Sequence, residues 1–239
     1  MKDTSHGQPT VVLVHGALTD ASVWNGAASR LRKAGCRVVA PALPMRGLGS
    51  DAAYLRSFLG SVPGPIVLVG HSYAGSVISH PAAVTPGVKA LVFISAFQPD
   101  EGESSGGLNE KFAGSRLGPD TTTVLAHPGG NDMYLKPECF REVYAGDLPP
   151  ETVATMAASQ RPIDPAALGE TLPGKAAWHT LPSWSLVSTQ DFSLPPELLR
   201  FMAGRAGSRV VEVDSSHASP VSRPDETARL IAEAARSVG

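Results

Sequence analysis

The sequence predicts an α/β fold, in which helices cover both faces of a mostly parallel sheet and a mainly helical lid is inserted into the chain. Three observations lead to this prediction. Short apolar, β-branched runs alternate with helix-like stretches along most of the chain. Two of these runs are apolar at nearly every position, which is typical of strands covered on both faces. The alternation is interrupted once, by a long stretch rich in Gly, Pro, Ser and Thr.

The predicted strands are short runs in which Val, Ile and Leu dominate. The two near-continuous apolar runs are TVVLV at 10–14 and IVLV at 66–69. Short connections between strands and helices favour parallel strands joined by right-handed crossovers. The six predicted strands cover residues 10–14, 37–40, 66–69, 88–94, 185–187 and 209–213.

Helix signals lie between these strands. Pro196 and Pro224 suit helix starts, because proline lacks only a donor that the first turn leaves unpaired. Gly35 and Gly207 stand where helix C-terminal caps belong. The predicted helices cover residues 24–34, 51–59, 73–80, 196–206 and 225–237.

The interruption between about residues 98 and 180 predicts the lid. It contains fragments of helix at 137–144, 150–159 and 165–168 but no clear core strand. Roughly 80 structureless residues inside a compact domain are improbable, so an insertion with its own structure is the better interpretation. The predicted division is a core of residues 1–97 and 181–239 with a lid of residues 98–180.

Composition narrows the class of protein. The chain has 239 residues and a formal net charge of −2, which gives no electrostatic case for binding nucleic acid or an anionic membrane. Residues 1–9 contain no apolar segment typical of a signal peptide, and no apolar run approaches the roughly 18–20 residues that span a bilayer. We therefore expect a cytoplasmic protein. Cys36 and Cys139 fit buried thiols, although one long-range disulfide is an alternative.

The strongest chemical signal follows the third predicted strand, in the sequence GHSYAG at 70–75. A serine between such a strand and a helix is held in a strained turn that exposes its hydroxyl, so Ser72 is the candidate nucleophile. The usual pattern is G-x-S-x-G, and here Ala74 takes the place of the second glycine, with Gly75 following. The alternative interpretation is a buried strand that ends in an ordinary Gly-Ser turn.

A serine nucleophile needs a base, and the base needs a third group that holds its tautomer. His217 follows the last predicted strand, and Asp191 follows the strand before it, which is the chain order Ser, Asp, His. Asp214 and Asp100 are weaker alternatives for the acid. The other histidines lie in the N-terminal tail, in turns, at a helix end or in the lid, namely His6, His15, His71, His80, His127 and His179.

Acyl transfer also needs donors for the tetrahedral oxyanion. The first strand ends in His-Gly, so the backbone N–H groups of Ala17 and Tyr73 are the candidate pair. Large apolar residues in the lid and near the turns are candidate walls of a substrate site, although each also suits an ordinary core. These wall candidates are Trp24, Phe97, Met133, Tyr134, Phe140, Trp178 and Trp184.

These motifs together resemble the α/β-hydrolase superfamily over essentially the whole chain. The matching pieces are VVLVHGALTDASVW at 11–24, VVAPALPMRGLGS at 38–50, GPIVLVGHSYAGSVI at 64–78 and the segment at 183–218. More narrowly, the chain is similar to the compact esterase-like branch of pyrethroid hydrolases, salicylate methylesterases and hydroxynitrile lyases. The resemblance implies Ser72, His217 and Asp191 as a triad, with no metal and no organic cofactor.

The expected function is hydrolysis of a carboxylic ester through an acyl-enzyme. Because few charged residues lie near these motifs, we expect an uncharged substrate of small to medium size. The expected partner is a small-molecule substrate, with no nucleic acid or membrane, and the protein is either a monomer or a homodimer. A lyase of the hydroxynitrile type is an alternative, and it would need a cation near the serine, for which the lid offers Lys111, Lys136 and Lys175. A slowly turning ligand-binding protein and a biosynthetic-pathway enzyme are further alternatives, because a shared fold does not settle chemistry.

Overall fold

The computed structural model describes residues 8–238. His6 and most of the segment examined for a signal peptide lie outside the described residues. Within residues 8–238, no helix combines the length and the apolar character that crossing a membrane requires. Cys36 and Cys139 are free, half-buried thiols, so the alternative of a disulfide is wrong.

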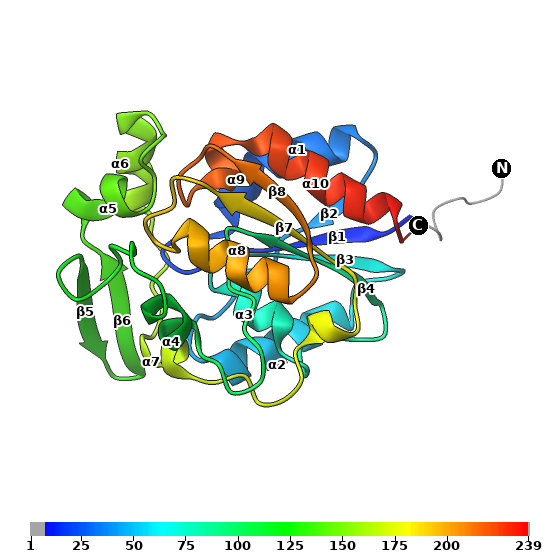
Figure 1. Ribbon diagram of the computed structural model, residues 1–239, viewed down its shortest axis with the longest axis horizontal. Helices are drawn as coiled ribbons and strands as arrows, with labels where there is room; N and C mark the ends of the chain where they lie inside the picture. The colour runs from blue at the N-terminus through cyan, green and yellow to red at the C-terminus, as the bar shows by residue number, and fades with distance from the viewer. Residues whose placement is uncertain (1–7, 239) are drawn as a thin grey trace.

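A six-stranded parallel sheet forms the centre of the fold, in the order β2-β1-β3-β4-β7-β8 (Figure 1). This arrangement confirms the predicted fold class. Every residue of β1 and β3 is buried, as their near-continuous apolar sequences predict. The strands are β1 (Thr10–Val14), β2 (Arg37–Val39), β3 (Ile66–His71), β4 (Val88–Ile94), β7 (Ser183–Ser188) and β8 (Arg209–Val213).

Helices cover both faces of this sheet. Alternate residues of β1 enter different cores, with Val12 and Val14 on one face and Val11 and Leu13 on the other. The first face carries α2 (Leu48–Leu59), α3 (Ala74–Ser79) and α8 (Pro196–Arg205). The second face carries η2 (Ala21–Trp24), α1 (Asn25–Lys33), α9 (Ser219–Ser222) and α10 (Pro224–Arg236).

The helix boundaries follow the proline and glycine signals of the sequence. Pro196 and Pro224 are the first residues of α8 and α10. Gly35 and Gly207 follow α1 and α8 with φ of 86° and 63°, a backbone conformation that only glycine adopts without strain. The helix predicted at 51–59 begins three residues earlier in the structure, where α2 starts at Leu48.

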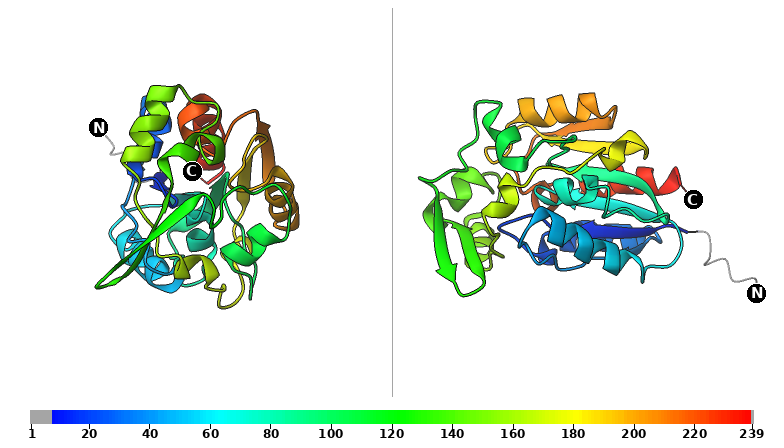
Figure 2. Two further views of the ribbon diagram at one scale, coloured as in Figure 1. Left: turned by 90° about the vertical axis from the view of Figure 1, so that its left-hand side faces the viewer. Right: turned by 90° about the horizontal axis from the view of Figure 1, so that it is seen from below.

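An insertion between β4 and β7 lies over one end of the sheet, as the right-hand view of Figure 2 shows. The three helices predicted within it are present. A two-stranded antiparallel hairpin accompanies them and was not predicted, because β5 is largely exposed and joins no core sheet. The elements are α4 (Ser105–Glu110), β5 (Thr122–His127), β6 (Gly130–Leu135), α5 (Pro137–Val143), α6 (Pro150–Ala158), α7 (Ala166–Gly169) and η3 (Ala177–His179).

The two ends of this insertion lie side by side. The N–H of Gly102 donates to the carbonyl oxygen of Leu172, and the N–H of Leu172 donates to that of Glu103, both at 2.9 Å. The Glu103 carboxylate also binds Arg205 of α8 at 2.7 Å, which ties the base of the insertion to the core. This closed base supports our proposal that residues 98–180 form a lid on the core.

Candidate active site

The turn after β3 holds Ser72 in a strained conformation. Ser72 has a φ of 56°, in the left-handed region that serine rarely adopts. A Cβ on Gly70 would lie 2.9 Å from the backbone of Ala74, and a Cβ on Gly75 would overlap the carbonyl oxygen of Phe97. Position 74 accepts alanine. Glycine is required at position 75 instead, because α3 comes close to the end of β4 there.

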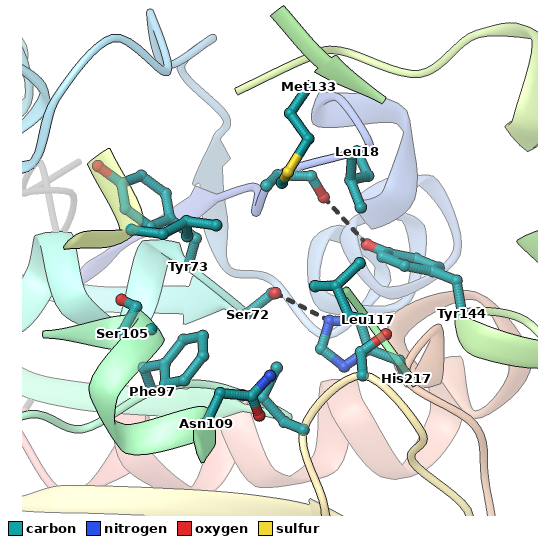
Figure 3. Close-up of a pocket in the computed structure, with 15 residues that line it drawn as sticks. Leu18, Ser72, Tyr73, Phe97, Ser105, Asn109, Leu117, Met133, Tyr144 and His217 are labelled. Atoms are coloured by element: carbon teal, nitrogen blue, oxygen red, sulfur yellow. Dashed lines mark hydrogen bonds between the residues drawn. The ribbon is translucent and has the colours of Figure 1, made fainter. Parts of the chain in front are cut away.

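Three distant side chains converge at the carboxyl end of the sheet. The Nε2 atom of His217 lies 2.8 Å from Oγ of Ser72 (Figure 3). Its Nδ1 lies 2.6 Å from Oδ2 of Asp191. The other carboxylate oxygen of Asp191 accepts from the N–H groups of Ser193 and Leu194, each at 2.8 Å. All three predicted side chains are buried, so their hydrogen bonds are shielded from water.

The weaker candidates for the acid lie elsewhere. Asp100 contacts His179 at 2.9 Å, at the base of the insertion. The side chain of Asp214 is exposed on the loop that precedes His217. The structure therefore brings only Asp191, among the three candidates, into contact with His217.

A second histidine supports the loop that carries His217. Because the acceptor is a carbonyl oxygen, Nε2 of His71 donates to the backbone oxygen of His217, at 2.9 Å. Burial lowers the pKa of His71 well below its ordinary value, and the nearby His217 ring lowers it further. His71 thus stays neutral and acts as a structural donor in this turn.

The two predicted oxyanion donors border the same cavity as Ser72. Ala17 and Tyr73 both line it, and within residues 8–238 neither backbone N–H donates to a protein acceptor. Gly16 lets the two segments approach, since a Cβ there would lie 2.6 Å from Cβ of Ser72. These two N–H groups are therefore free for a ligand oxygen.

The cavity beside Ser72 is small, about 50 Å³. Of the predicted wall residues, Phe97 and Met133 line it. Its other walls are mostly aliphatic side chains and small polar groups contributed by the insertion and by the loop after Asp191. The complete lining is Ala17, Leu18, Ser72, Tyr73, Phe97, Ser105, Gly106, Asn109, Leu117, Met133, Tyr144, Leu168, Ser193, Leu194 and His217.

The structure places the other predicted wall residues outside this cavity. Trp24 packs in the core on the opposite face of the sheet, beneath α1 and α10. Trp178 is buried at the base of the insertion, where its Nε1 donates to the carbonyl oxygen of Pro99 at 3.0 Å. Tyr134 alternates with the inward-facing Met133 along β6 and so points away. Two further candidates, Phe140 and Trp184, belong to the cores.

Tyr144, at the end of α5, is a cavity residue that the sequence did not suggest. Its ring meets the His217 ring edge-on at 4.7 Å, and its hydroxyl lies 3.5 Å from the carbonyl oxygen of Ala17 (Figure 3). Burial raises the phenol pKa, and the negative charge of Asp191 raises it further, so the group remains a donor. No sequence motif marks a tyrosine that acquires its place only through the folding of the insertion.

Within the described residues, no three His, Cys, Asp or Glu side chains gather closely enough to hold a metal ion.

The profile of the Alpha/beta hydrolase family matches residues 11–230. The chain belongs to this family. The membership confirms the resemblance seen in the motifs.

Individual relatives differ in how much of this α/β hydrolase they match. An alpha/beta hydrolase of Aspergillus novofumigatus is 28% identical over 249 residues, which cover 95% of this chain and 97% of that protein. The carbendazim hydrolyzing esterase of Nocardioides sp. is 36% identical over 108 residues, which cover 39% of this chain and 44% of that esterase. The match therefore spans less than half of the Nocardioides enzyme.

Solved structures share the fold. The crystal structure of a pyrethroid hydrolase from Sphingobium faniae superimposes with a TM-score of 0.77 at 22% identity, covering 96% of this chain and 98% of that one. At this identity the similarity is one of architecture.

A buried Tyr-Asp pair anchors the nucleophile turn of this α/β hydrolase. The hydroxyl of Tyr73 donates to Oδ2 of Asp51 at 3.0 Å, and both side chains are buried. Burial raises the pKa of both groups. Tyr73→Phe is expected to lower the free energy of unfolding by about 1–3 kcal/mol, because a buried carboxylate loses a donor. Urea denaturation measures this change.

The matched control is Tyr54→Phe, on the same helix α2 as Asp51. Tyr54 is exposed, and its hydroxyl makes no hydrogen bond within residues 8–238. Its replacement should leave the free energy of unfolding nearly unchanged. Equal effects of the two substitutions would mean that the Tyr73 hydroxyl contributes nothing to stability.

His15 gives this α/β hydrolase a source of acid sensitivity. Its Nδ1 donates to the carbonyl oxygen of Gly16 at 2.9 Å, and its Nε2 accepts from the N–H of Leu43 at 3.1 Å. Burial lowers the pKa of His15 below 6.5, and a proton on Nε2 would break the bond from Leu43. The unfolded chain takes up this proton first, so the contribution to stability is complete above pH 6.5 and is lost as the pH falls below it.

His15→Gln is expected to reduce this pH dependence. The glutamine oxygen can accept from the Leu43 N–H and does not titrate. The free energy of unfolding of the native protein should therefore fall more steeply between pH 6.5 and 5 than that of the variant, by up to about 1.4 kcal/mol per pH unit. Denaturation series at several pH values measure both slopes, and identical slopes would contradict the prediction.

Proposed function

We propose that this α/β hydrolase cleaves a small to medium, uncharged carboxylic ester through an acyl-enzyme. The observation that carries the proposal is the continuous hydrogen-bonded series from Ser72 through His217 to Asp191, beside two unoccupied backbone donors. The proposed nucleophile, base and oxyanion donors all line one cavity, and the proposed orienting acid contacts the base without lining that cavity.

The mechanism follows from these positions. His217 removes the proton of Ser72 as the hydroxyl attacks the ester carbonyl, and the N–H groups of Ala17 and Tyr73 stabilise the oxyanion. The imidazolium of His217, stabilised by Asp191, then protonates the departing alcohol. Water, activated by the same imidazole, attacks the acyl-enzyme and releases the acid.

The character of the cavity supports an uncharged substrate. Its lining includes no Asp, Glu, Lys or Arg within residues 8–238. An isolated charge on a ligand would lose its hydration without gaining an ionic partner, which is costly in a buried site. The name of the Nocardioides relative, an esterase, agrees with the proposed reaction class.

The lyase alternative lacks its cation in this cavity. Nζ of Lys111 lies 3.8 Å from Glu103, and Nζ of Lys136 donates to the carbonyl oxygen of Asp120. Lys175 lines a separate surface pocket. None of the three lid lysines lines the cavity at Ser72, so hydrolysis is the function that the geometry favours.

The decisive experiment compares the two reactions and their time courses. We expect steady release of p-nitrophenol from p-nitrophenyl acetate over many turnovers, with no release of cyanide from mandelonitrile. A burst of one acyl group per chain followed by near silence would instead support a slowly turning ligand-binding protein. Cyanide release without ester cleavage would support the lyase.

A further inference from the structure

A second, larger cavity adjoins the one at Ser72. It lies between α4, the loop at 112–119 and the β5-β6 hairpin, and its volume is about 590 Å³, against about 50 Å³ for the inner cavity. Ligand sites usually measure roughly 300–1,000 Å³, so the inner cavity alone is too small for an ordinary ester substrate. The two cavities share five lining residues, Gly106, Asn109, Leu117, Met133 and Leu168.

We call these five shared residues the neck, and one of them, Leu117, lines the inner cavity together with His217 (Figure 3). The segment that carries Leu117 is held in place. Nδ2 of Asn109 donates to Oγ of Ser115, and this hydroxyl donates to the carbonyl oxygen of Ser193, both at 2.9 Å. The next N–H, of Arg116, donates to the carbonyl oxygen of Phe192 at 2.7 Å. The neck is therefore tied to the loop that follows Asp191.

The outer cavity is mainly apolar. Val124 and Met133 are directly opposite each other on the hairpin, and both line this cavity. Val124 is 50% exposed, although valine side chains are usually buried. Glu110 is the only charged residue of the lining within residues 8–238. An uncharged, apolar group suits such a surface, because its burial there removes apolar area from water.

We propose that the outer cavity is a second subsite, which holds the apolar far end of the ester, and that Leu117 at the neck selects for unbranched chains. This inference rests on the proposed esterase function. The reacting carbonyl occupies the inner cavity at Ser72, and a slender chain passes Leu117 and Met133 to reach the outer cavity. Groups branched close to the carbonyl are excluded at the neck.

The first test measures kcat/KM along two ester series. One lengthens the acyl chain of p-nitrophenyl esters from acetate to decanoate, and the other lengthens the alcohol of alkyl acetates. We expect one series to gain up to about fourfold per added methylene, as for burial of a methylene group, until the outer cavity is filled. The series that responds identifies which half of the ester the cavity holds, and two flat series would overturn the proposal.

Two substitutions test whether the outer cavity causes the dependence of kcat/KM on chain length. Val124→Asp should lower the ratio of kcat/KM for the longest ester to that for the shortest by about tenfold, since a carboxylate would border the bound chain. The matched control is Leu125→Asp, because Leu125 is similarly exposed on the same strand but lines neither cavity. Equal ratios in the two variants would contradict the subsite.

The neck has its own test. Leu117→Ala should raise kcat/KM for an ester branched in the responding half relative to its unbranched counterpart by about tenfold, the ratio expected for the gain of one to two methylene-sized volumes. The pair is p-nitrophenyl isobutyrate and acetate if the acyl series responds, and isopropyl acetate and ethyl acetate if the alcohol series responds. An unchanged ratio would mean that Leu117 does not select the substrate.

A binding measurement distinguishes failure of the proposed subsite from failure of the proposed esterase function. Binding of 2-decanone to Ser72→Ala, measured by calorimetry, requires no turnover and should be weakened by Val124→Asp. If the native protein hydrolyses esters but chain length has no effect on hydrolysis or binding, the subsite is wrong. If 2-decanone binds in this way while no ester is cleaved, the subsite stands and the proposed reaction is wrong.

Discussion

Ser72→Ala is expected to lower kcat for ester hydrolysis by about a millionfold, the size of effect known for loss of the nucleophile in a serine protease. The methyl group that replaces the hydroxymethyl cannot form an acyl-enzyme. The free N–H groups of Ala17 and Tyr73 remain, so binding and some residual stabilisation of the oxyanion persist. Steady-state kinetics with p-nitrophenyl acetate measure the loss, with circular dichroism to verify folding.

A matched control separates chemistry from packing. Ser76→Ala removes another buried serine hydroxyl one turn further along α3, where Oγ of Ser76 contacts Oγ of Ser105 at 2.8 Å. This variant should retain kcat and lose about 1 kcal/mol of stability. A fluorophosphonate should label the native protein and Ser76→Ala at Ser72, as located by mass spectrometry, and leave Ser72→Ala unlabelled. Labelling at any other serine, or a similar kcat in both variants, would exclude Ser72 as the nucleophile.

The sheet and the converging side chains were predictable because each depends on local sequence. Buried parallel strands read as continuous apolar runs, and β1 and β3 are such runs. Parallel strands share one carboxyl edge, so the positions of Ser72, Asp191 and His217 directly after three strands already implied their proximity. Strand order itself was not predictable from these signals, since it depends on long-range pairing.

The insertion was harder to predict, because its structure depends on contacts distant in sequence. The β5-β6 hairpin is exposed on much of its surface, so its apolar alternation is weak. Its turn contains Pro128 and Gly129, a signal that could have suggested two strands on either side.

Aromatic residues were a poor guide to the cavity walls. Trp24 and Trp178 are large and apolar, but their size places them in packed cores rather than beside an opening. Tyr144 was missed because nothing local distinguishes it. Its position arises when the N–H of Ala218, next to His217, donates to the Tyr144 carbonyl oxygen at 3.0 Å. Such a contact between the insertion and the core has no signature in either segment alone.

Asp191→Asn is expected to lower kcat by about ten-thousandfold while the fold persists, the effect known for this change in a serine protease. Oδ1 of Asp191 accepts from the N–H groups of Ser193 and Leu194, so the asparagine must keep its oxygen there. Its amide NH₂ then faces Nδ1 of His217. That nitrogen must become an acceptor, which places the imidazole proton on Nε2, toward Ser72.

In this tautomer His217 can no longer take the proton of Ser72, although every heavy atom keeps its position. The control is Asp147→Asn, because Asp147 accepts from Oγ of Ser216, the neighbour of His217, but does not touch the imidazole. It should retain kcat, and fluorophosphonate labelling should slow only in Asp191→Asn. A loss of less than tenfold in Asp191→Asn would show that the tautomer of His217 is set by something other than this carboxylate. Asp191→Asn is therefore the most informative substitution at this position, because the N–H donors that fix the Asp191 carboxylate also fix the orientation of the asparagine amide.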